Sequence, residues 1–393
     1  MRRTPSYRRG HAAQTADLVV VGGGIVGVSI AVFAARAGLR VHVFERGALG
    51  GAATLRSGAM IRTHYENRAD ARLAVEGREL FIKWGEAIGG DPGFRRTGFV
   101  YLPGRGELAT GALSDRVAML RDVGSDAEMV DSEALRDFAP DLEPGSVERA
   151  VIEPESGYAD PHRTMAALIA AARDSGAVMV EGEPVTRISC ESGRVGGVTT
   201  TLRAVAANAV VLCCGAWAPG LAAGLGLELE IRPTAALPAR FATAGRVGPA
   251  AIDVPNGVYF RSDGASGLLA GLRDWRERDL DGPDGLLPEV DEQFGGRALA
   301  AVARRVPAVA PARFVGGRSG PLDMTPDGRP LLGPTAVEGL WLSCGWSGTG
   351  FKTGPAAGRA LVHWLLHGLP HHPDIRELAP GRLMTRSETR TPH

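Results

Sequence analysis

Three glycines near the N-terminus have the spacing of a loop that binds the phosphates of a dinucleotide. Gly22, Gly24 and Gly27 form the pattern GxGxxG between an apolar run at 18–21 and a helical stretch at 25–37. In such loops the first glycine permits a tight turn, the second lets a pyrophosphate approach the backbone, and the third lets the helix lie on the sheet. Free N–H groups at the helix start favour phosphates. The alternative is a chance glycine-rich turn.

An acidic residue follows at the position that suits a ribose. Glu45 ends the next apolar strand, 41–44, and stands eighteen residues past Gly27. A carboxylate at this position accepts hydrogen bonds from ribose hydroxyls. The strand, loop, helix and second strand make a complete βαβ unit, which predicts a Rossmann-type domain that binds either NAD or FAD.

A second glycine-rich segment, CGWSGTGFKTGPAAG at 344–358, surrounds a lysine. Lys352 is one of only two lysines, the other being Lys83, although lysine and arginine together number 44. Lysine adapts to burial by shifting its pKa, whereas arginine does not. The segment therefore predicts that Lys352 faces an active site. The alternative is a surface lysine beside a glycine turn.

The loop that follows the second strand, GAATLRSGAMIRTHY at 51–65, contains two further candidates. Its small residues suit a loop against a flat ring, and Arg62 is either a bidentate partner for a carboxylate or an exposed arginine. His64 is either a substrate contact or a residue at a helix end. Tyr259 and Arg261, in NGVYFRSDG, either line a substrate face or belong to a plain strand.

Composition and charge narrow the class of protein. The chain has 393 residues, of which 44% are hydrophobic and 22% charged, and this is typical of a globular protein with two or three domains. The formal net charge is +0, so nothing global attracts nucleic acid or an anionic membrane. Glycine, at 54 residues, has about twice its usual share, which predicts many tight turns and close backbone approaches.

The cysteines and the apolar runs indicate the compartment. None of the four cysteines has the spacing of a metal site, and buried free thiols in a reducing cytoplasm account for them. No apolar run is long enough to span a membrane, and the arginine-rich N-terminus lacks the apolar region of a secretory signal. We therefore expect a cytoplasmic protein with no metal and no membrane span.

The order of the expected elements predicts an α/β fold, in which a mostly antiparallel β-sheet domain is inserted into the Rossmann-type domain. A strand at 340–343 and a helix at 355–367 return the chain to the first domain. The expected segments are 16–84, 151–225 and 319–370 for the cofactor domain, 85–150 and 226–318 for the substrate domain, a disordered basic tail at 1–15 and a C-terminal tail at 371–393.

These motifs, together with VVLCCGAWAP at 210–219 and TPDGRPLLGPT at 325–335, resemble the D-amino-acid oxidase/sarcosine oxidase superfamily of FAD-dependent amine oxidoreductases. The resemblance covers 17–369 and favours the sarcosine oxidase and dimethylglycine dehydrogenase-like branch. It implies FAD as the cofactor. The residues that it places against FAD are Gly22, Gly24, Ile25, Val26, Gly27, Glu45, Arg46, Thr54, Ser57, Gly58, Val185, Gly215, Trp217, Gly345, Gly348, Gly350, Phe351 and Lys352.

The resemblance also implies a reaction: oxidation of a C–N bond in a small amino acid or a secondary or N-methyl amine, with hydride passing to flavin N5 and an imine as product. In relatives a lysine after Gly-Phe helps to bind the substrate carboxylate, which is the position of Lys352. Arg62, His64, Tyr259 and Arg261 are expected on the substrate side. A 2-hydroxy acid is the alternative substrate, and a flavoprotein subunit of a larger electron-transfer complex is the alternative role. A flavin monooxygenase is disfavoured, because no second Gly-Asp cofactor motif stands out.

The sequence departs from the superfamily pattern in two places. Relatives with covalent flavin carry a cysteine shortly before the TPD segment, whereas 318–326 reads RSGPLDMTP. With neither cysteine nor histidine there, we expect FAD to be held non-covalently. The segment SGLLAGL at 266–272 has leucine where sarcosine oxidase relatives often place the lysine that promotes reaction with O2. The electron acceptor, O2 or another, and the oligomeric state stay open.

Overall fold

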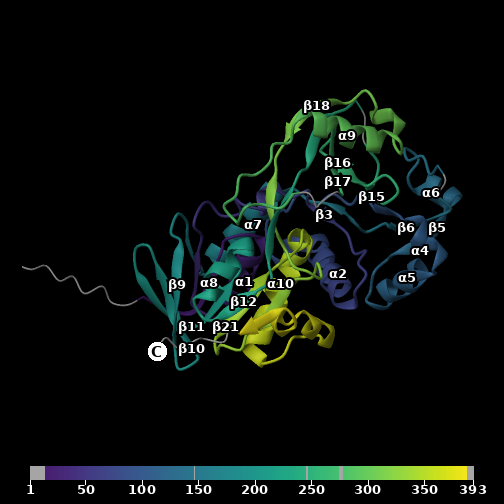
Figure 1. Ribbon diagram of the computed structural model, residues 1–393. Helices are drawn as coiled ribbons and strands as arrows, with labels where there is room; N and C mark the ends of the chain where they lie inside the picture. Colours follow the sequence, from purple (N-terminus) through teal and green to yellow (C-terminus); the bar gives the residue numbers. More distant parts are fainter. Residues whose placement is uncertain (1–13, 146, 245–246, 274–277, 387–393) are drawn as a thin grey trace, which may run out of the picture.

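Two eight-stranded sheets organise the computed structural model, which describes residues 14–145, 147–244, 247–273 and 278–386 (Figure 1). The first sheet has the order β20-β21-β11-β1-β2-β8, extended beside β11 by β10 and β9. Neighbours from β21 to β8 are parallel, whereas β20 pairs antiparallel with β21. The strands are β1 Gln14–Val21, β2 Val41–Phe44, β8 Val178–Val180, β9 Val185–Glu191, β10 Arg194–Thr200, β11 Ala204–Leu212, β20 Leu331–Pro334 and β21 Leu340–Cys344.

Strand β1 shows why the sequence has an uninterrupted apolar run here. Leu18 and Val20 belong to the core on one face of the sheet, and Val19 and Val21 belong to the core on the other. All four side chains are at most 5% exposed. A parallel strand covered on both faces has no polar side, so alternation disappears from its sequence.

Helices pack against the first sheet and against one another. Helix α1 follows the glycine motif and contacts both α7 and α10, and α10 in turn contacts α2. Asp160 caps α7 by accepting hydrogen bonds from two N–H groups of its first turn, and Pro161 occupies the first position. The bounds are α1 Ile25–Arg36, α2 Arg68–Ile82, α3 Trp84–Ala87, α7 Pro161–Asp174, α8 Ala218–Ala223 and α10 Gly350–His367.

The second sheet is antiparallel except at one pair, β15 with β4. Its order is β18-β14-β17-β16-β15-β4-β6-β5, and α9 packs against β14, β16, β17 and β18. The bounds are β4 Phe99–Leu102, β5 Glu128–Asp131, β6 Arg149–Glu153, β14 Ala239–Ala242, β15 Ala250–Asp253, β16 Val258–Ser262, β17 Gly267–Leu272, β18 Arg313–Gly317, α4 Arg105–Ala109, α5 Ala112–Asp122, α6 Ser132–Phe138 and α9 Glu292–Ala303. The predicted fold class, α/β with a mostly antiparallel second sheet, is confirmed.

Three short antiparallel pairs lie outside the two large sheets. They are β3 Met60–Ile61 with β7 Gly157–Tyr158, β13 Arg232–Ala236 with β19 Gly320–Met324, and β12 Leu227–Leu229 with β22 Met384–Arg386. The strands of the second sheet lie within 99–153 and 239–317, so the predicted boundary between 150 and 151 falls inside β6. The division into a cofactor domain and a substrate domain stays a prediction.

The chain ends need one correction. Residues 1–13 and 387–393 of the two predicted tails lie outside the described residues, and Gln14 and Thr15 already belong to β1. The segment from 373 to 386 is packed rather than a free tail, because Ile375 and Leu378 are fully buried. These two apolar residues are three positions apart in a single helical turn, and the polar residues around them hid that pattern.

Helix α10 begins earlier than the sequence indicated. The expected start was Pro355, whereas the helix begins at Gly350 and contains that proline. Pro355 is the sixth residue of this helix, so it removes one N–H···O=C hydrogen bond of the second turn but leaves the first turn intact. As a consequence, Lys352 lies in the first helical turn instead of in a preceding loop.

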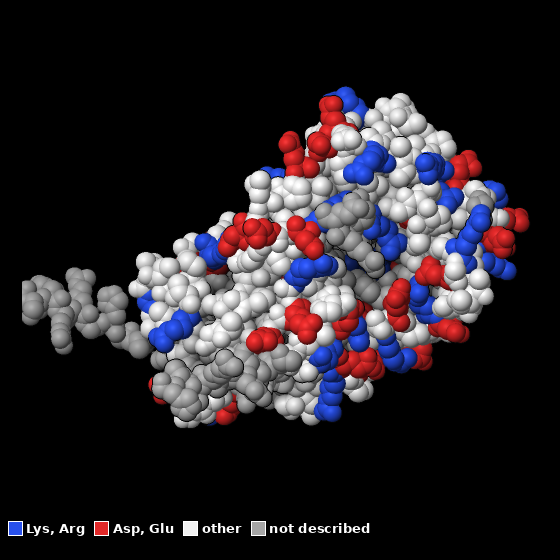
Figure 2. Space-filling view, viewed as in Figure 1, with Lys and Arg blue, Asp and Glu red and all other residues white. Residues whose placement is uncertain are grey.

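Acidic and basic side chains are interspersed over the described surface in Figure 2. On this face no large region carries a single sign of charge, in keeping with the formal net charge of +0.

Candidate active site

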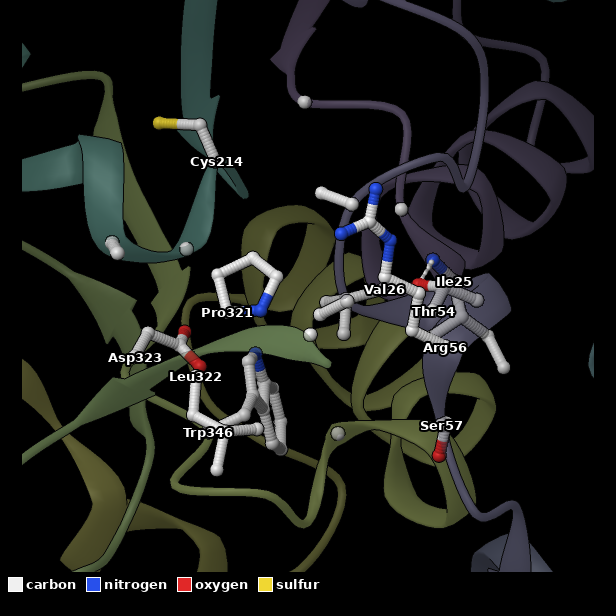
Figure 3. A pocket seen from close by; sticks show the side chains of 18 of the residues that line it. Ile25, Val26, Thr54, Arg56, Ser57, Cys214, Pro321, Leu322, Asp323 and Trp346 are labelled. Atoms are coloured by element: carbon white, nitrogen blue, oxygen red, sulfur yellow. Dashed lines mark hydrogen bonds between the residues drawn. The ribbon is translucent and has the colours of Figure 1, made fainter. Parts of the chain in front are cut away.

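A cavity of about 1040 Å³ is lined by residues of both large sheets (Figure 3). The dinucleotide-type loop at 22–26, the small-residue loop at 50–62 and the segment at 346–352 all contribute to its wall. Two glycine-rich segments that lie far apart in the sequence therefore meet at one cavity. Its size is at the upper end of the range for small-molecule sites.

The glycines of the first loop have the geometry that their spacing predicted. Gly22 has a φ of +108°, and a Cβ atom there would lie 2.6 Å from the carbonyl oxygen of Cys213. A Cβ atom on Gly27 would lie 2.0 Å from the carbonyl oxygen of Gly22, so this glycine lets α1 pack against the loop. Gly24 is the N-cap of α1, and the N–H of Ile25 donates to Thr54 Oγ1 (3.1 Å).

Most residues that the resemblance placed against FAD line this cavity. They are Gly22, Gly24, Ile25, Val26, Glu45, Arg46, Thr54, Ser57, Gly58, Val185, Gly215, Trp217, Gly348, Gly350, Phe351 and Lys352. Gly27 and Gly345 are outside its wall. Gly27 packs against the loop, and Gly345 has a φ of +71° and donates its N–H to Asp323 Oδ2 (2.7 Å). Their effect on a cofactor is therefore through the shape of the loops.

Glu45 stands at the edge of the dinucleotide-type loop. Its carboxylate accepts hydrogen bonds from the N–H groups of Gly23 and Gly47, both at 2.8 Å. A carboxylate has about four lone-pair sites, so acceptor capacity remains for the hydroxyls of a ribose.

Arg46 and Trp217 form a cluster with a residue that the sequence analysis missed. The Arg46 guanidinium lies 4.3 Å from the centre of the Trp217 ring and pairs with Asp284 at 2.5 Å. Trp217 Nε1 also donates to Asp284 (3.0 Å). Hydrogen bonds from Arg46 and then from Trp217 lower the pKa of Asp284. Asp284 belongs to the segment after the second sheet's β17, so this cluster links that segment to residues that follow β2 and β11 of the first sheet.

Two basic side chains of the cavity wall meet at one tyrosine. Lys352 Nζ donates to Tyr65 Oη (3.0 Å) and lies 5.6 Å from the centre of the Tyr65 ring. The Arg62 guanidinium lies 4.6 Å from the same ring centre and donates to the carbonyl oxygen of His64. Arg62 and Lys352 both line the cavity. An anionic group beside Tyr65 would therefore find two basic partners, Arg62 and Lys352.

Burial shifts the pKa values of Lys352 and of two side chains near it, Glu153 and Tyr65. Desolvation, followed by repulsion from Arg62, holds the pKa of Lys352 well below its usual value, while the nearby Glu153 opposes the shift. Burial raises the pKa of Glu153, which is fully buried and accepts hydrogen bonds from Thr63 N–H (2.7 Å) and Ser156 Oγ (2.6 Å). Burial also raises the pKa of Tyr65 to about 12.

Of the three other predicted substrate-side residues, Tyr259 lines the cavity and two do not. The His64 ring stacks on Tyr101 with ring centres 4.0 Å apart and lies 3.3 Å from an Arg116 nitrogen. Burial, then repulsion from Arg62 and Arg116, holds its pKa well below the usual value.

Arg261 is only 2% exposed, and its guanidinium forms hydrogen bonds with other residues of this chain. Its Nε donates to the carbonyl oxygen of Gly58 (2.6 Å), and its Nη1 donates to Asp263 (3.0 Å). The guanidinium also lies 4.5 Å from the centre of the Tyr158 ring. Arg261 therefore fixes the small-residue loop on the second sheet, and the geometry gives no substrate contact to it or to His64.

Asp323 is a cavity residue that the sequence analysis did not single out. It lies in β19, four residues before Asp327 of the TPDG segment, and it points into the cavity near Trp346 (Figure 3). Removal from water raises its pKa to about 6, although backbone N–H groups of Trp346 and Gly345 oppose the shift. The sequence signal was available, because an acidic residue in an otherwise apolar strand is unusual.

The architecture and the cavity define a class of protein, and a family model shows the same class directly. The model of the DAO family, described as FAD dependent oxidoreductase, matches residues 17–364. The chain belongs to this family, so the resemblance seen in the sequence is confirmed. Members are FAD-dependent amine and amino-acid oxidoreductases.

Particular relatives are similar over nearly the whole chain. Human mitochondrial dimethylglycine dehydrogenase is 26% identical over 385 residues, covering 93% of this chain but only 44% of that protein. The beta subunit of sarcosine oxidase from an Arthrobacter species is 27% identical over 373 residues, covering 90% of this chain and 88% of that subunit. This chain thus spans less than half the length of the mitochondrial relative.

Solved structures agree in fold. L-proline dehydrogenase from P. horikoshii superimposes with a TM-score of 0.85 at 25% identity, covering 94% of this chain and 98% of that chain. Glycine oxidase from Geobacillus kaustophilus has a TM-score of 0.79 at 25% identity and covers 93% of this chain and 98% of that chain. Both relatives act on amino acids by name.

The residues present fit FAD. Gly22 and Gly24 line the cavity at the start of α1, where the N–H groups of a helix's first turn lack partners within the helix and can bind a pyrophosphate, although that of Ile25 donates to Thr54 Oγ1. Helix α10 directs its N-terminus, with Gly350 and Phe351, at the same cavity. A positive helix end suits the negative edge of a reduced flavin.

Two further findings concern the described residues only. None of their helices has both the length and the apolar composition needed to cross a membrane. Within the same residues, no group of three or more histidine, cysteine or acidic side chains is arranged to hold a metal ion.

Proposed function

We propose that this chain oxidises a C–N bond of a small amino acid or N-methyl amino acid with non-covalently bound FAD. The observation that carries the proposal is that Arg62 and Lys352, both in the wall of the cavity that the dinucleotide-type loop also lines, meet at the side chain of Tyr65. A carboxylate between them would fix the orientation of a substrate. Arginine supplies the planar, two-point hydrogen bonding that suits a carboxylate.

Bound FAD would supply the two-electron oxidation that converts the amine into an imine, which water then hydrolyses. The chain's own residues bind and orient the substrate. Arg62 binds the carboxylate, and the hydrogen bond of Lys352 to Tyr65 keeps the lysine beside it. Tyr259 of β16 lines the cavity from the second sheet. No side chain has to form a covalent bond, so the site needs neither a nucleophile nor a metal.

Non-covalent binding is supported by the residues near β19. The segment 318–326 contains neither cysteine nor histidine. Burial raises the pKa of Cys213 and Cys214, which line the cavity, so their thiols are poor nucleophiles. We expect precipitation with acid to release the flavin into the supernatant. Flavin that stays with the pellet would show a covalent bond.

The test is anaerobic bleaching of the bound flavin by matched pairs of compounds. Glycine, sarcosine and L-proline serve as amine probes, and glycolate and lactate as 2-hydroxy acid probes. The proposal expects bleaching by at least one amine probe and by neither hydroxy acid. Bleaching by a hydroxy acid alone would overturn it in favour of 2-hydroxy acid oxidation.

A second candidate is a flavoprotein subunit of a larger electron-transfer complex. It is favoured by the match to a protein that is itself one subunit of sarcosine oxidase. Here amines would bleach the flavin while O2 re-oxidises it slowly. Leu268 and Leu269 of β17 are buried where relatives often place a lysine for the oxygen reaction, which supports an acceptor other than O2. Re-oxidation of the bleached protein in air-saturated buffer measures this directly.

A further inference from the structure

Lys352 is buried without an acidic partner. It is 6% exposed, and its Nζ has Tyr65 Oη as its hydrogen-bond partner among the described residues. Within the same residues it forms no ion pair. A lysine ammonium is almost never buried in this way unless a carboxylate accompanies it.

Three physical effects disfavour the charged form of this side chain. Its amine is removed from water, the Arg62 guanidinium shares the same tyrosine ring, and the residue lies in the first turn of α10, where the helix dipole repels cations. The direction of the Lys352 pKa shift, well below the usual value, follows from the first two. The positive N-terminal end of α10 also disfavours the charged form of Lys352.

The neighbouring ionisable groups do not reverse this balance. Glu153 favours the ammonium, but its carboxyl is itself buried and already accepts two hydrogen bonds. On the adjoining α2 the charged side chains have partners of their own: Asp70 with Arg329, Arg72 with Asp374, Glu76 with Arg359 and His371, and Arg78 with Asp126. On α1, Arg36 donates to the carbonyl oxygens of Ala87 and Ile88. The other charged residues in the cavity wall are Glu45, Arg46, Arg56, Arg273, Asp284 and Asp323.

We infer that Lys352 is the base that removes the proton from the substrate's ammonium group. The inference rests on the proposed function, because it concerns how an amino acid becomes reactive in the same site. An amino acid arrives in neutral water as a zwitterion, whereas its nitrogen must hold a free lone pair before the C–N bond is oxidised. A neutral lysine beside the carboxylate site can take the proton from the substrate's ammonium group and so leave a free lone pair on the substrate nitrogen.

The proton transfer is balanced within the site. One N–H bond of the substrate ammonium breaks, and its electron pair stays on the substrate nitrogen. The lone pair of Lys352 Nζ takes the proton, either directly or through one water. The new Lys352 ammonium then completes a pair of cations with Arg62 around the substrate carboxylate, so the charge that was unfavourable in the empty site is favourable in the complex. Departure of the product carboxylate returns the proton to water.

The two lysines of the chain make a direct test possible. Lysine labelled with ¹³C at Cε gives one resonance each for Lys83, which is exposed, and Lys352, and Lys352→Arg identifies the second. In the resting holoenzyme the Lys352 resonance should report a neutral amine at pH 8. Addition of acetate as a carboxylate probe should move the Lys352 resonance to its protonated position. A Lys352 resonance that already reports an ammonium in the resting holoenzyme at pH 8 would overturn the inference.

The kinetic test separates a base from a simple carboxylate-binding charge. Arginine keeps the positive charge but does not deprotonate. In Lys352→Arg, anaerobic bleaching by the best of glycine, sarcosine and L-proline should fall about 100-fold or more at pH 7. It should recover by about tenfold per pH unit toward the pKa of the probe's amine, since only the neutral probe then reacts. Lys83→Arg, the matched control, should keep the wild-type profile.

Failure of this inference and failure of the proposed function give different experimental results. If the wild-type protein bleaches and Lys352→Arg bleaches with the same pH profile, Lys352 only binds the carboxylate and the inference is wrong. If none of the three probes bleaches the wild-type flavin, the proposed function itself fails, and this is seen before any variant is made. Lys352→Met, which removes charge and base together, should show the loss at pH 7 even if the larger arginine disturbs packing.

Discussion

At the scale of single residues, the substrate side of the cavity depends on Arg62. Replacing it with methionine should weaken binding of a carboxylate substrate about 10- to 100-fold, because hydrogen bonds to charged groups contribute about 1.5–3 kcal/mol each. Affinity for FAD should be unchanged. Substrate-dependent bleaching and fluorescence titration with FAD measure the two affinities separately.

Arg116 provides the matched control for that prediction. It is also an arginine next to His64, but it pairs with Glu107 and lies outside the cavity wall. Arg116→Met should leave substrate affinity within about twofold, as expected for a side chain that does not touch the substrate. Equal losses in the two variants would mean that Arg62 acts on the fold and not on the carboxylate.

The buried lysine should cost stability in a pH-dependent way. Its pKa is lowered in the folded protein, so the unfolded chain binds more protons below the usual lysine pKa, and folding loses stability as the pH falls. Lys352→Met should therefore raise the free energy of unfolding at pH 7 by about 1–3 kcal/mol and by less at pH 10. Urea unfolding at both pH values checks this.

Lys83→Met is the control for the stability prediction. Lys83 is exposed, so the same substitution should change the free energy of unfolding by no more than about 0.5 kcal/mol at either pH. A destabilised Lys352→Met variant would show that the Lys352 amine contributes favourable interactions that its burial does not outweigh.

Residue types and motifs predicted part of this site. Arg62 and Lys352 line the cavity because each follows a loop whose small residues leave room beside it. His64, two positions past Arg62, turns the other way onto Tyr101, and Arg261 is held by Gly58 and Asp263. These orientations depend on neighbours from other elements. No spacing within one segment contains that information.

At the scale of elements, the contact of α2 with α10 holds Lys352 in place. A Cβ atom on Gly77 of α2 would lie 2.1 Å from the carbonyl oxygen of Lys352, which is backbone and cannot rotate away. Gly77→Ala should force the helices apart, lowering the free energy of unfolding by about 1–3 kcal/mol and weakening substrate binding with it. Urea unfolding and bleaching titrations measure the two effects.

Gly296→Ala in α9 is the control for Gly77→Ala. A Cβ atom at Gly296 meets nothing within 4 Å, so alanine there should stabilise the helix by about 0.5–1 kcal/mol. If both alanines are tolerated equally, the α2–α10 contact is looser than its geometry indicates, and it does not position Lys352.

Regular elements were predictable where one physical pattern dominated. The βαβ unit follows from two buried apolar strands around a helix that begins at the glycine motif, and β2 has the predicted bounds. The start of α10 was misplaced because Pro355 indicated a boundary that a proline in the second turn does not impose. The segment 373–378 was missed because its burial depends on α2, to which Asp374 is paired through Arg72.

At the scale of the whole molecule, residues from both large sheets line one cavity. The cluster of Arg46, Trp217 and Asp284 connects the first sheet to the segment after β17 at the cavity wall. We predict that Asp284→Asn speeds FAD dissociation about two- to fivefold, since an exposed ion pair contributes about 0.2–1 kcal/mol. The rise in flavin fluorescence after dilution of the holoenzyme follows the release.

Asp281→Asn tests whether the effect belongs to this cluster. Asp281 is in the same segment but outside the cavity wall, and no ion pair links it to Arg46. Its substitution should leave the rate of FAD release unchanged. Equal acceleration in both variants would attribute the effect to the charge of the segment as a whole.

The central claim is that the two remote glycine-rich segments bind one FAD together, and calorimetric titration of the apoprotein tests it most directly. We predict one FAD per chain, bound at least about 100-fold more tightly than ADP or FMN, because linking two half-sites makes the second contact intramolecular. ADP that binds as tightly as FAD would contradict the claim, since the segment at 346–352 would then add nothing.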